Sequence, residues 1–232
     1  VLKKMLRTAS RHPFLVTIGI IPESPHTGYG YIERGSRFDS GAEFYHVRRF
    51  VEKPSPQKAR SYLRSGRFYW NSGMFAFRAD TMIEAVGKHV PDLYEGLRAI
   101  TDAFDTKKES RVLRRLFPTL PSVSIDYAVM EKAVNVLVIP ATFGWNDVGS
   151  WSALEQISST DTAGNTVQGS MVALNSRGNI VNTEDSLVAL IDTDDMIVAQ
   201  AGDRILVAPK RSSQKVKDLV NELKERDLTE YV

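Results

Sequence analysis

The chain has 232 residues, of which 42% are hydrophobic and 25% charged, a composition typical of a globular protein with one or two domains. A formal net charge of +2 without long runs of Lys or Arg argues against nucleic-acid binding, and no apolar run is long enough to span a bilayer. The absence of cysteine excludes disulfides, thiolate metal sites and cysteine nucleophiles.

The first apolar stretch is FLVTIGII, residues 14–21, which follows a basic, helix-like segment. A basic start followed by an apolar run is also the pattern of a signal peptide. Here the run is short, rich in β-branched residues and ended by Pro22, and no small-residue cleavage site follows it. We therefore predict a short helix and then a buried strand.

Strand and helix signals alternate through the next part of the chain, which predicts an α/β layer fold. Aromatic and β-branched runs predict strands at residues 48–54, 68–78 and 134–141. Helices are predicted at 55–66, closed by Gly66, at 79–104 in two pieces broken at Pro91, and after an N-cap at Ser124.

After about Thr160 the pattern becomes all-β, with short apolar runs separated by turn clusters. We therefore predict two domains, residues 1–160 and 161–232. The C-terminal segment 212–228 has helical periodicity and places four apolar side chains on one stripe, namely Val216, Leu219, Val220 and Leu223. This stripe is predicted to be buried against the protein itself, and a homodimer contact is the alternative.

Polar residues at the ends of predicted strands form candidate binding sites. The turn at Gly30 exposes N–H groups that could meet a hydroxyl or phosphate, although taken alone it is better explained as a plain turn. Glu52 and Lys53 offer a carboxylate for sugar hydroxyls and an ammonium for a phosphate; a surface ion pair is the alternative. Pro54 is expected to hold Lys53 in extended geometry. Asn71 both donates and accepts, as a hydroxyl-rich ligand requires.

The stretch GWNDVGSW, residues 144–151, places Asp147 between two tryptophans and two glycines. We predict a rigid loop that turns at Gly144 and Gly149 and holds Asp147 in one place. Asp147 could cap a helix, pair with a basic residue or bind a divalent cation. Mg²⁺ takes one or two protein carboxylates together with phosphate oxygens and water, so a single well-held Asp meets half of that need.

Five stretches occur in one order: TGYGYIE, FVEKP, WNSGMF, SIDYAVMEK and GWNDVGSW. From about Thr17 to the C-terminus the chain resembles the mannose-1-phosphate guanylyltransferases, sugar nucleotidyltransferases that make GDP-mannose from GTP and mannose 1-phosphate. The resemblance implies a Rossmann-like α/β nucleotidyltransferase domain followed by a small left-handed β-helix, and a cytoplasmic location.

The resemblance also implies roles for individual residues. Gly30, Glu52, Lys53 and Asn71 correspond to contacts with the sugar phosphate, and Lys53 and Asp147 to catalytic residues. Asp147 corresponds to one of two carboxylates that hold the catalytic Mg²⁺. The tryptophans of GWNDVGSW would then fix the loop so that Asp147 faces the cleft.

One departure from the family is large. The glycine-rich loop that cradles the nucleotide phosphates and the second metal carboxylate have no counterpart in the chain, so we expect an incomplete nucleotidyltransferase domain that is inactive alone, with the GTP site largely elsewhere. Two other functions stay open: another hexose-1-phosphate nucleotidyltransferase, and a catalytically silent regulatory homologue that binds sugar nucleotide. A C-terminal isomerase domain, which some family members carry, is also left open.

Overall fold

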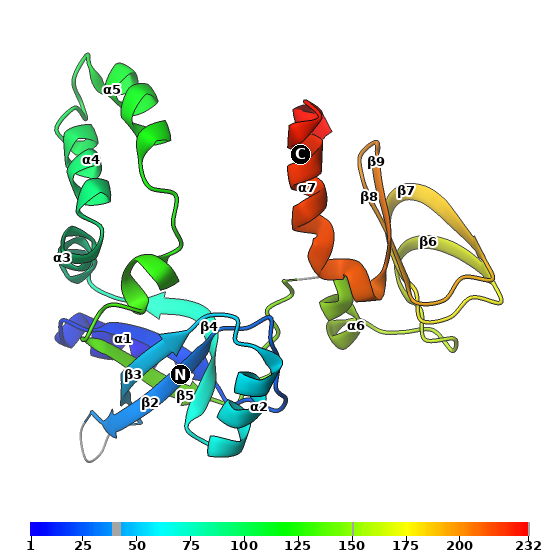
Figure 1. Ribbon diagram of the computed structural model, residues 1–232, viewed down its shortest axis with the longest axis horizontal. Coiled ribbons are helices and arrows are strands. Elements are labelled where there is room, and N and C mark those ends of the chain that lie inside the picture. Colours follow the sequence, from blue (N-terminus) through cyan, green and yellow to red (C-terminus); the bar gives the residue numbers. More distant parts are fainter. Residues whose placement is uncertain (39–42, 150, 232) are drawn as a thin grey trace. The chain divides into compact units, whose positions relative to one another are not determined.

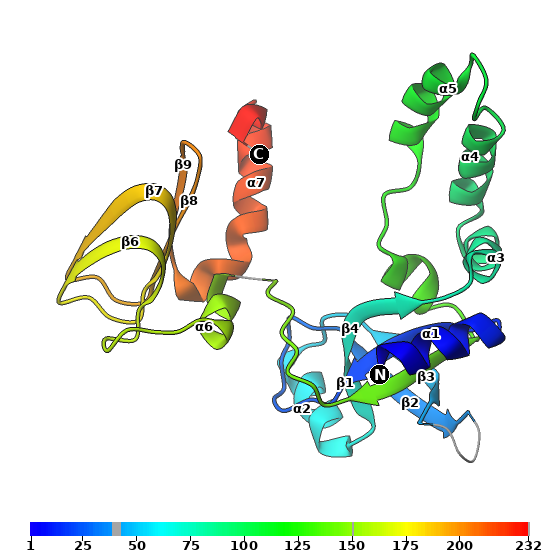
Figure 2. The same cartoon turned by 180° about the vertical axis from the view of Figure 1, so that it is seen from behind.

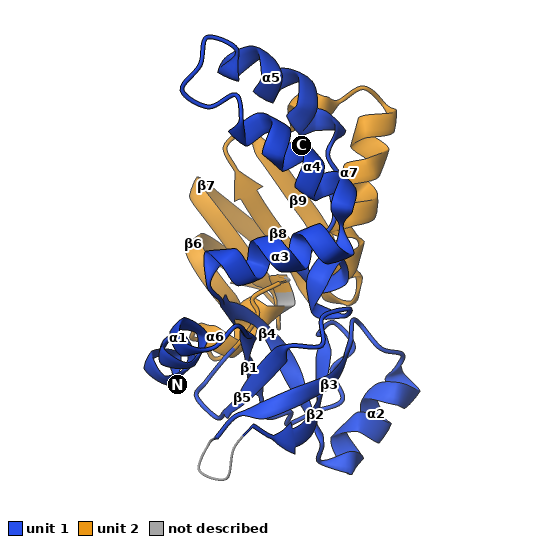
Figure 3. Cartoon of the chain, turned by 90° about the vertical axis from the view of Figure 1, so that its left-hand side faces the viewer, with its two compact units in different colours: residues 1–145 blue, residues 146–232 orange. Residues whose placement is uncertain are grey.

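A computed structural model describes residues 1–38, 43–149 and 151–231 (Figure 1). The chain divides into two compact units, Val1–Trp145 and Asn146–Val232, which are coloured separately in Figure 3. The domain boundary expected at residue 160 lies inside the second unit.

Five strands of the first unit close into a barrel. Their order around it is β1 (Leu15–Ile20), β4 (Phe68–Ala76), β2 (Tyr31–Arg37), β3 (Tyr45–Val51) and β5 (Val136–Ala141). Among these five, only β1 and β5 pair in parallel, and the other neighbouring pairs are antiparallel. The expected α/β elements are present, but strand β2 was not predicted. It pairs with β3, its successor in the chain, as an antiparallel neighbour, which needs no crossover helix.

Strand β1 lies at the centre of this unit, and all six of its residues are buried, as predicted for residues 14–21. Helix α1 (Leu2–Arg11) packs beside it through Met5 and Ala9 (Figure 2). Helix α2 (Pro56–Ser65) adds Ala59 and Tyr62 to the same core. The ends of α2 follow the sequence signals, because Ser55 accepts from the backbone N–H of Lys58 and Gly66 takes a φ of +64°.

Three helices lead away from the barrel one after another: α3 (Ala79–His89), α4 (Pro91–Thr101) and α5 (Glu109–Leu116) (Figures 1 and 2). The predicted break at Pro91 is confirmed, and α5 was not predicted. A 3₁₀ turn, η1 (Phe117–Thr119), follows. The segment expected to be a helix capped by Ser124 is instead the π-helical turn η2 (Asp126–Met130), in which Glu131 N–H donates to the Asp126 carbonyl at 2.9 Å.

The second unit winds three parallel strands, β6 (Thr166–Leu174), β7 (Ile180–Ile191) and β8 (Met196–Ala201), and ends in β9 (Arg204–Pro209), antiparallel to β8. Two of the short apolar runs of the sequence, NIVN (residues 179–182) and SLVALI (186–191), belong to one strand, β7. Trp151 and Leu154, from η3 (Trp151–Ala153) and α6 (Leu154–Ile157), pack on its apolar core. The unit closes with η4 (Lys210–Lys215), α7 (Val216–Glu225) and η5 (Thr229–Tyr231).

The apolar stripe of α7 is only partly covered. Val216, Val220 and Leu223 are half-buried, but Leu219 is 46% exposed. The expectation that the chain itself buries the whole stripe is therefore wrong at Leu219. Among the helices that the structure describes, none has the length and apolar character needed to cross a membrane.

Two buried asparagines connect successive windings of the second unit. The Asn165 side chain accepts from the backbone N–H of Asn179 at 2.9 Å. Asn179, fully buried, donates to Asn165 Oδ1 and to the Thr193 carbonyl, and accepts from the backbone N–H of Met196 at 2.9 Å. Buried polar backbone groups that the turns would otherwise leave unpaired are satisfied in this way.

Replacing Asn179 by Leu should lower the free energy of unfolding by about 2–4 kcal/mol, because the Met196 N–H and the Thr193 carbonyl lose their buried partner. Urea denaturation of both proteins measures this. Asn182→Leu in the same strand is the matched control, since its side chain makes only a 3.5 Å contact with Gln168. An equal effect of the two substitutions would show that the asparagine ladder carries no special stability.

Candidate functional site

Gly30, Glu52 and Asn71, predicted separately from three motifs, lie together in the first unit. A Cβ atom added to Gly30 would collide with Oε2 of Glu52 and would lie 3.3 Å from Cβ of Asn71. The Asn71 backbone N–H also donates to the Gly30 carbonyl at 2.8 Å. Glycine at position 30 therefore makes the space that the Glu52 carboxylate occupies.

Asn71 is held at both ends of its amide. Its Nδ2 donates to Oδ1 of Asp126 at 2.8 Å, and its Oδ1 accepts from the backbone N–H of Gly73 at 3.2 Å. These bonds fix the orientation of the amide and leave one N–H and one oxygen lone pair for a ligand. Asp126 begins the π-helical turn η2, and such turns are frequent at functional sites.

Tyr127 follows Asp126 and borders the same group of side chains. Desolvation, and then the negative charges of Glu52, Glu131 and Asp126, raise the pKa of the Tyr127 hydroxyl. A tyrosine hydroxyl is in any case protonated at neutral pH, so it is able to donate to a ligand. We call Gly30, Glu52, Asn71, Asp126 and Tyr127 the polar cluster. Asp126 and Tyr127 lie in the motif SIDYAVMEK, but the residue types alone indicated no role for either.

Lys53 departs from the extended geometry that Pro54 was expected to impose. Its φ is +44°, in the left-handed region, which is rare for a residue other than glycine and is further disfavoured before proline. The chain therefore bends at this point, directly after β3. Lys53 is exposed while Glu52 is half-buried, so the bend separates the surroundings of the two side chains. Backbone strain of this kind concentrates at functional sites.

Several aromatic rings pack around the segment that precedes Gly30. The His26 ring stacks on Tyr29 with centroids 3.8 Å apart, and Tyr29 meets Trp70 and Trp145 edge-on at 5.1 and 5.2 Å. The Tyr31 hydroxyl donates to the His26 carbonyl at 2.9 Å. These contacts hold the segment before Gly30 against the barrel.

Asp147 belongs to the second unit and is exposed, whereas the polar cluster belongs to the first unit. Its loop is organised by Asn146, whose Oδ1 accepts from the Val148 N–H at 2.8 Å and whose Nδ2 donates to Oε1 of Gln156 at 2.6 Å. A Cβ on Gly149 would lie 2.6 Å from Oδ2 of Asp147. The loop therefore holds the carboxylate close over Gly149.

The turn of this loop is at Val148 and not at the flanking glycines. Val148 has a φ of +46°, an uncommon value for a β-branched residue, while neither Gly144 nor Gly149 has a positive φ. The side-chain bond from Asn146 stabilises that conformation, which the glycine positions alone did not reveal. The two tryptophans pack in different units, Trp145 on the barrel core and Trp151 on the β6–β9 unit. Ser150 lies outside the described residues.

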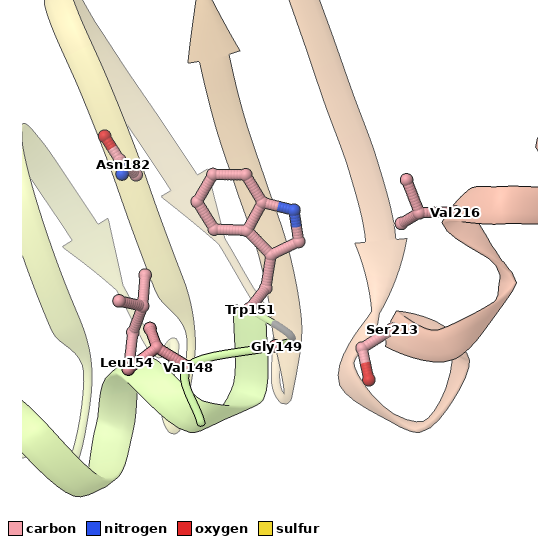
Figure 4. A pocket seen from close by; sticks show the side chains of 7 residues that line it. All are labelled: Val148, Gly149, Trp151, Leu154, Asn182, Ser213 and Val216. Carbon is pink, nitrogen blue, oxygen red and sulfur yellow. The ribbon is translucent and has the colours of Figure 1, made fainter. Parts of the chain in front are cut away.

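A cavity of about 350 Å³ lies beside this loop within the second unit. In Figure 4, Trp151 projects between Asn182 of β7 and Val216 of α7. The remaining lining residues are Val148, Gly149, Leu154 and Ser213. Asp147 is not among the residues that line this largely apolar cavity. Among the described residues, no three His, Cys, Asp or Glu side chains gather closely enough to hold a metal ion.

Two family models match the chain. Residues 1–164 match the nucleotidyl transferase family model, and residues 169–223 match the MannoseP isomerase/GMP-like beta-helix domain. A mannose-1-phosphate guanylyltransferase of Escherichia coli is 42% identical over 219 residues, which are 94% of this chain and 46% of that protein. The enzyme of the same name from Salmonella montevideo is 42% identical over 223 residues, 94% of this chain and 47% of that protein.

A crystal structure described as mannose-1-phosphate geranyltransferase from Thermus thermophilus is similar with a TM-score of 0.77 and 39% identity, over 96% of this chain and 64% of that one. The chain spans about half the length of the curated relatives it matches. The resemblance expected from the five motifs is confirmed by these relatives. The chain belongs to the nucleotidyl transferase family and continues into a β-helix domain of the mannose-phosphate isomerase and guanylyltransferase type.

Proposed function

We propose that the protein of which this chain forms part transfers GMP from GTP to mannose 1-phosphate, giving GDP-mannose and pyrophosphate. The observation that carries the proposal is the polar cluster. Three residues from separate motifs, Gly30, Glu52 and Asn71, meet there beside Lys53, in a chain 42% identical to mannose-1-phosphate guanylyltransferases. Carboxylate and amide groups suit sugar hydroxyls, and the ammonium suits the sugar's phosphate.

In the proposed reaction, an oxygen of the mannose 1-phosphate attacks the α-phosphate of GTP in line. A new P–O bond forms as the bond to the leaving pyrophosphate breaks. Such a transfer depends on positioning and charge neutralisation more than on covalent work by side chains. Glu52 and Asn71 orient the sugar, Asp126 orients Asn71, and Lys53 aligns the attacking phosphate.

The residues present fit part of the ligand set of a Mg²⁺ site. Asp147 is an exposed carboxylate on a loop that Asn146 holds in shape, and Mg²⁺ is commonly bound by one or two carboxylates plus phosphate oxygens and water. When bound, the ion neutralises charge on the triphosphate. In this proposal Asp147 supplies one of its two carboxylate ligands.

Several finer expectations belong to the same proposal. They are the left-handed sense of the β-helix, the cytoplasmic location, the homodimer, the inactivity of the chain alone and the nearness of Asp147 to the polar cluster in the working enzyme. The exposed Leu219 on α7 supports the homodimer, because a second subunit would remove this apolar side chain from water. Each of these points stays a prediction.

The test of the function is an assay of the complete protein with mannose 1-phosphate and each of the four nucleoside triphosphates, repeated with other hexose 1-phosphates. GDP-mannose formed from GTP and mannose 1-phosphate is the expected product. A preference for another pair would identify a different hexose-1-phosphate nucleotidyltransferase. Binding of sugar nucleotide without turnover would identify a silent regulatory homologue.

Gly30→Ala should raise KM for mannose 1-phosphate by about tenfold or more, because the new methyl group displaces the Glu52 carboxylate from its position. Steady-state kinetics measure this, and thermal unfolding checks that the fold is kept. Gly144→Ala is the control, because a Cβ there meets nothing within 4 Å. An unchanged KM would remove Glu52 from the sugar site.

Lys53→Ala should weaken mannose 1-phosphate more than GTP, by on the order of 1–3 kcal/mol, the value of a charge-assisted hydrogen bond. The readout is KM for each substrate in the complete enzyme. Lys58→Ala, an exposed lysine on α2, removes the same charge and should leave both values unchanged. Equal losses for both substrates would contradict the role given to Lys53.

Asp147→Asn should reduce kcat severely in the complete enzyme with little effect on the fold, because the amide keeps the shape but loses the charge that attracts Mg²⁺. Turnover is measured across a Mg²⁺ titration. Asp218→Asn on the exposed side of α7 is the control for loss of one carboxylate. Near-normal turnover at low Mg²⁺ would exclude Asp147 from the metal site.

A further inference from the structure

Strands β2 and β3 contain an irregularity that gathers arginines. Glu33 of β2 pairs with Arg49 of β3, but the next residue, Arg34, pairs with Val47, so Arg48 is an extra residue in β3. In a regular strand Arg48 and Arg49 would point to opposite faces. A bulge removes that alternation and re-aims a side chain. Here it brings both guanidinium groups to Glu33.

The carboxylate between these arginines is buried. Glu33 is only 4% exposed, and Oε2 accepts from Nε of Arg49 at 2.7 Å, while Nη1 of Arg48 is 3.7 Å from Oε1. A buried carboxylate needs a positive partner, and Arg49 supplies it. Arg48 is therefore a second cation beside a charge that is already paired.

A third arginine completes the group. Arg67 lies directly before β4, and its carbonyl accepts from the backbone N–H of Arg34 at 3.0 Å, which ties it to the bulged part of the hairpin. Glu33, Arg48, Arg49 and Arg67 line a cavity of about 390 Å³, which we call the arginine pocket. Three positive charges stand against one negative charge, so the pocket carries two positive charges in excess.

The pocket is also preorganised. The guanidinium carbon of Arg49 lies 5.7 Å from the centroid of the Tyr62 ring and 5.5 Å from that of Phe68. These two rings stack on each other at 3.9 Å, so Arg49 rests on a fixed aromatic surface. The Arg49 side chain is therefore ordered before a ligand binds, so that binding loses less side-chain conformational entropy.

The arginine pocket is distinct from the polar cluster. Phe68, beneath Arg49, and Asn71, in the polar cluster, are three residues apart on β4, and side chains at an odd spacing in a strand point to opposite faces. None of the residues assigned to the proposed reaction lines the pocket.

We propose that the arginine pocket is a second anion site, which binds the phosphoryl group of a phosphate-bearing small molecule. Two surplus charges match a phosphate dianion better than a single carboxylate. The planar guanidinium fork also matches the geometry of phosphate oxygens. Free pyrophosphate and the phosphate tail of a nucleotide share this chemistry. The inference does not depend on the reaction proposed above.

Isothermal titration of the chain with inorganic pyrophosphate, and separately with ATP, tests the proposal. Saturable binding is expected, and it should weaken as salt is added. Arg48→Ala with Arg67→Ala should weaken it about tenfold or more, as loss of charge-assisted contacts does. If the arginine variant loses affinity for both ligands, the site binds the phosphate tail of a nucleotide. If it loses affinity for pyrophosphate and the unmodified chain does not bind ATP, the site binds the free anion. Either result supports the site.

Arg111→Ala, on the exposed face of α5, removes one charge elsewhere and should leave the affinity within about twofold. The single variant Arg67→Ala, checked by thermal unfolding, serves if the double variant does not fold. Wild-type affinity in the arginine variants, or no saturable binding by the unmodified chain, would overturn the proposal. So would loss of binding in Lys53→Ala, because the anion would then lie at Lys53.

Discussion

The parallel pairing of β1 with β5 is the constraint on which the first unit depends. β1 is buried at every residue and is hydrogen-bonded on both edges, to β4 on one side and to β5 on the other. Through β4 it sets the position of Asn71, and β5 ends directly before the segment that carries Trp145 and Asp147. Two parallel strands cannot be joined by a tight hairpin. The long connection from β1 to β5, which we call the excursion and which runs through β2 to η2, therefore brings β5 alongside β1. The residues of the polar cluster belong to that excursion.

Local signals in the sequence predicted much of this fold. The caps Ser55 and Gly66 of α2 and the break at Pro91 act through their own backbone geometry, so they hold without knowledge of the rest of the chain. The failures come from tertiary context. Lys53 adopts a positive φ in spite of Pro54, and residues 126–130 form a π-helical turn where a capped helix was expected. At the π-helical turn, Asp126 accepts from Asn71 of β4, a contact outside the segment that local signals do not contain.

The candidate site, like the fold, could be predicted from the sequence only in part. Residue chemistry singled out Asn71, because an amide in an apolar strand is costly without a partner, but it left a plain turn open at Gly30 and a surface ion pair open at Glu52, and the roles of these residues rested on the family resemblance. It did not identify Asp126, whose role depends on a hydrogen bond to a residue 55 positions earlier in the chain. The arginine pocket was also missed, because the bulge that makes it arises from the pairing of two strands and has no local signature.

The antiparallel strand β9 limits where further windings could be added to the second unit. The windings β6, β7 and β8 are parallel and repeat, but β9 occupies the free edge of β8 in the opposite sense, so no further winding can add there. A longer form of this unit would have to gain whole windings between existing ones. Each added winding would need its own asparagine to accept from the backbone of the next, as Asn165 does from Asn179 and Asn179 does from Met196. Insertions of a partial winding would break that ladder, so length variation in this unit should proceed in complete repeats.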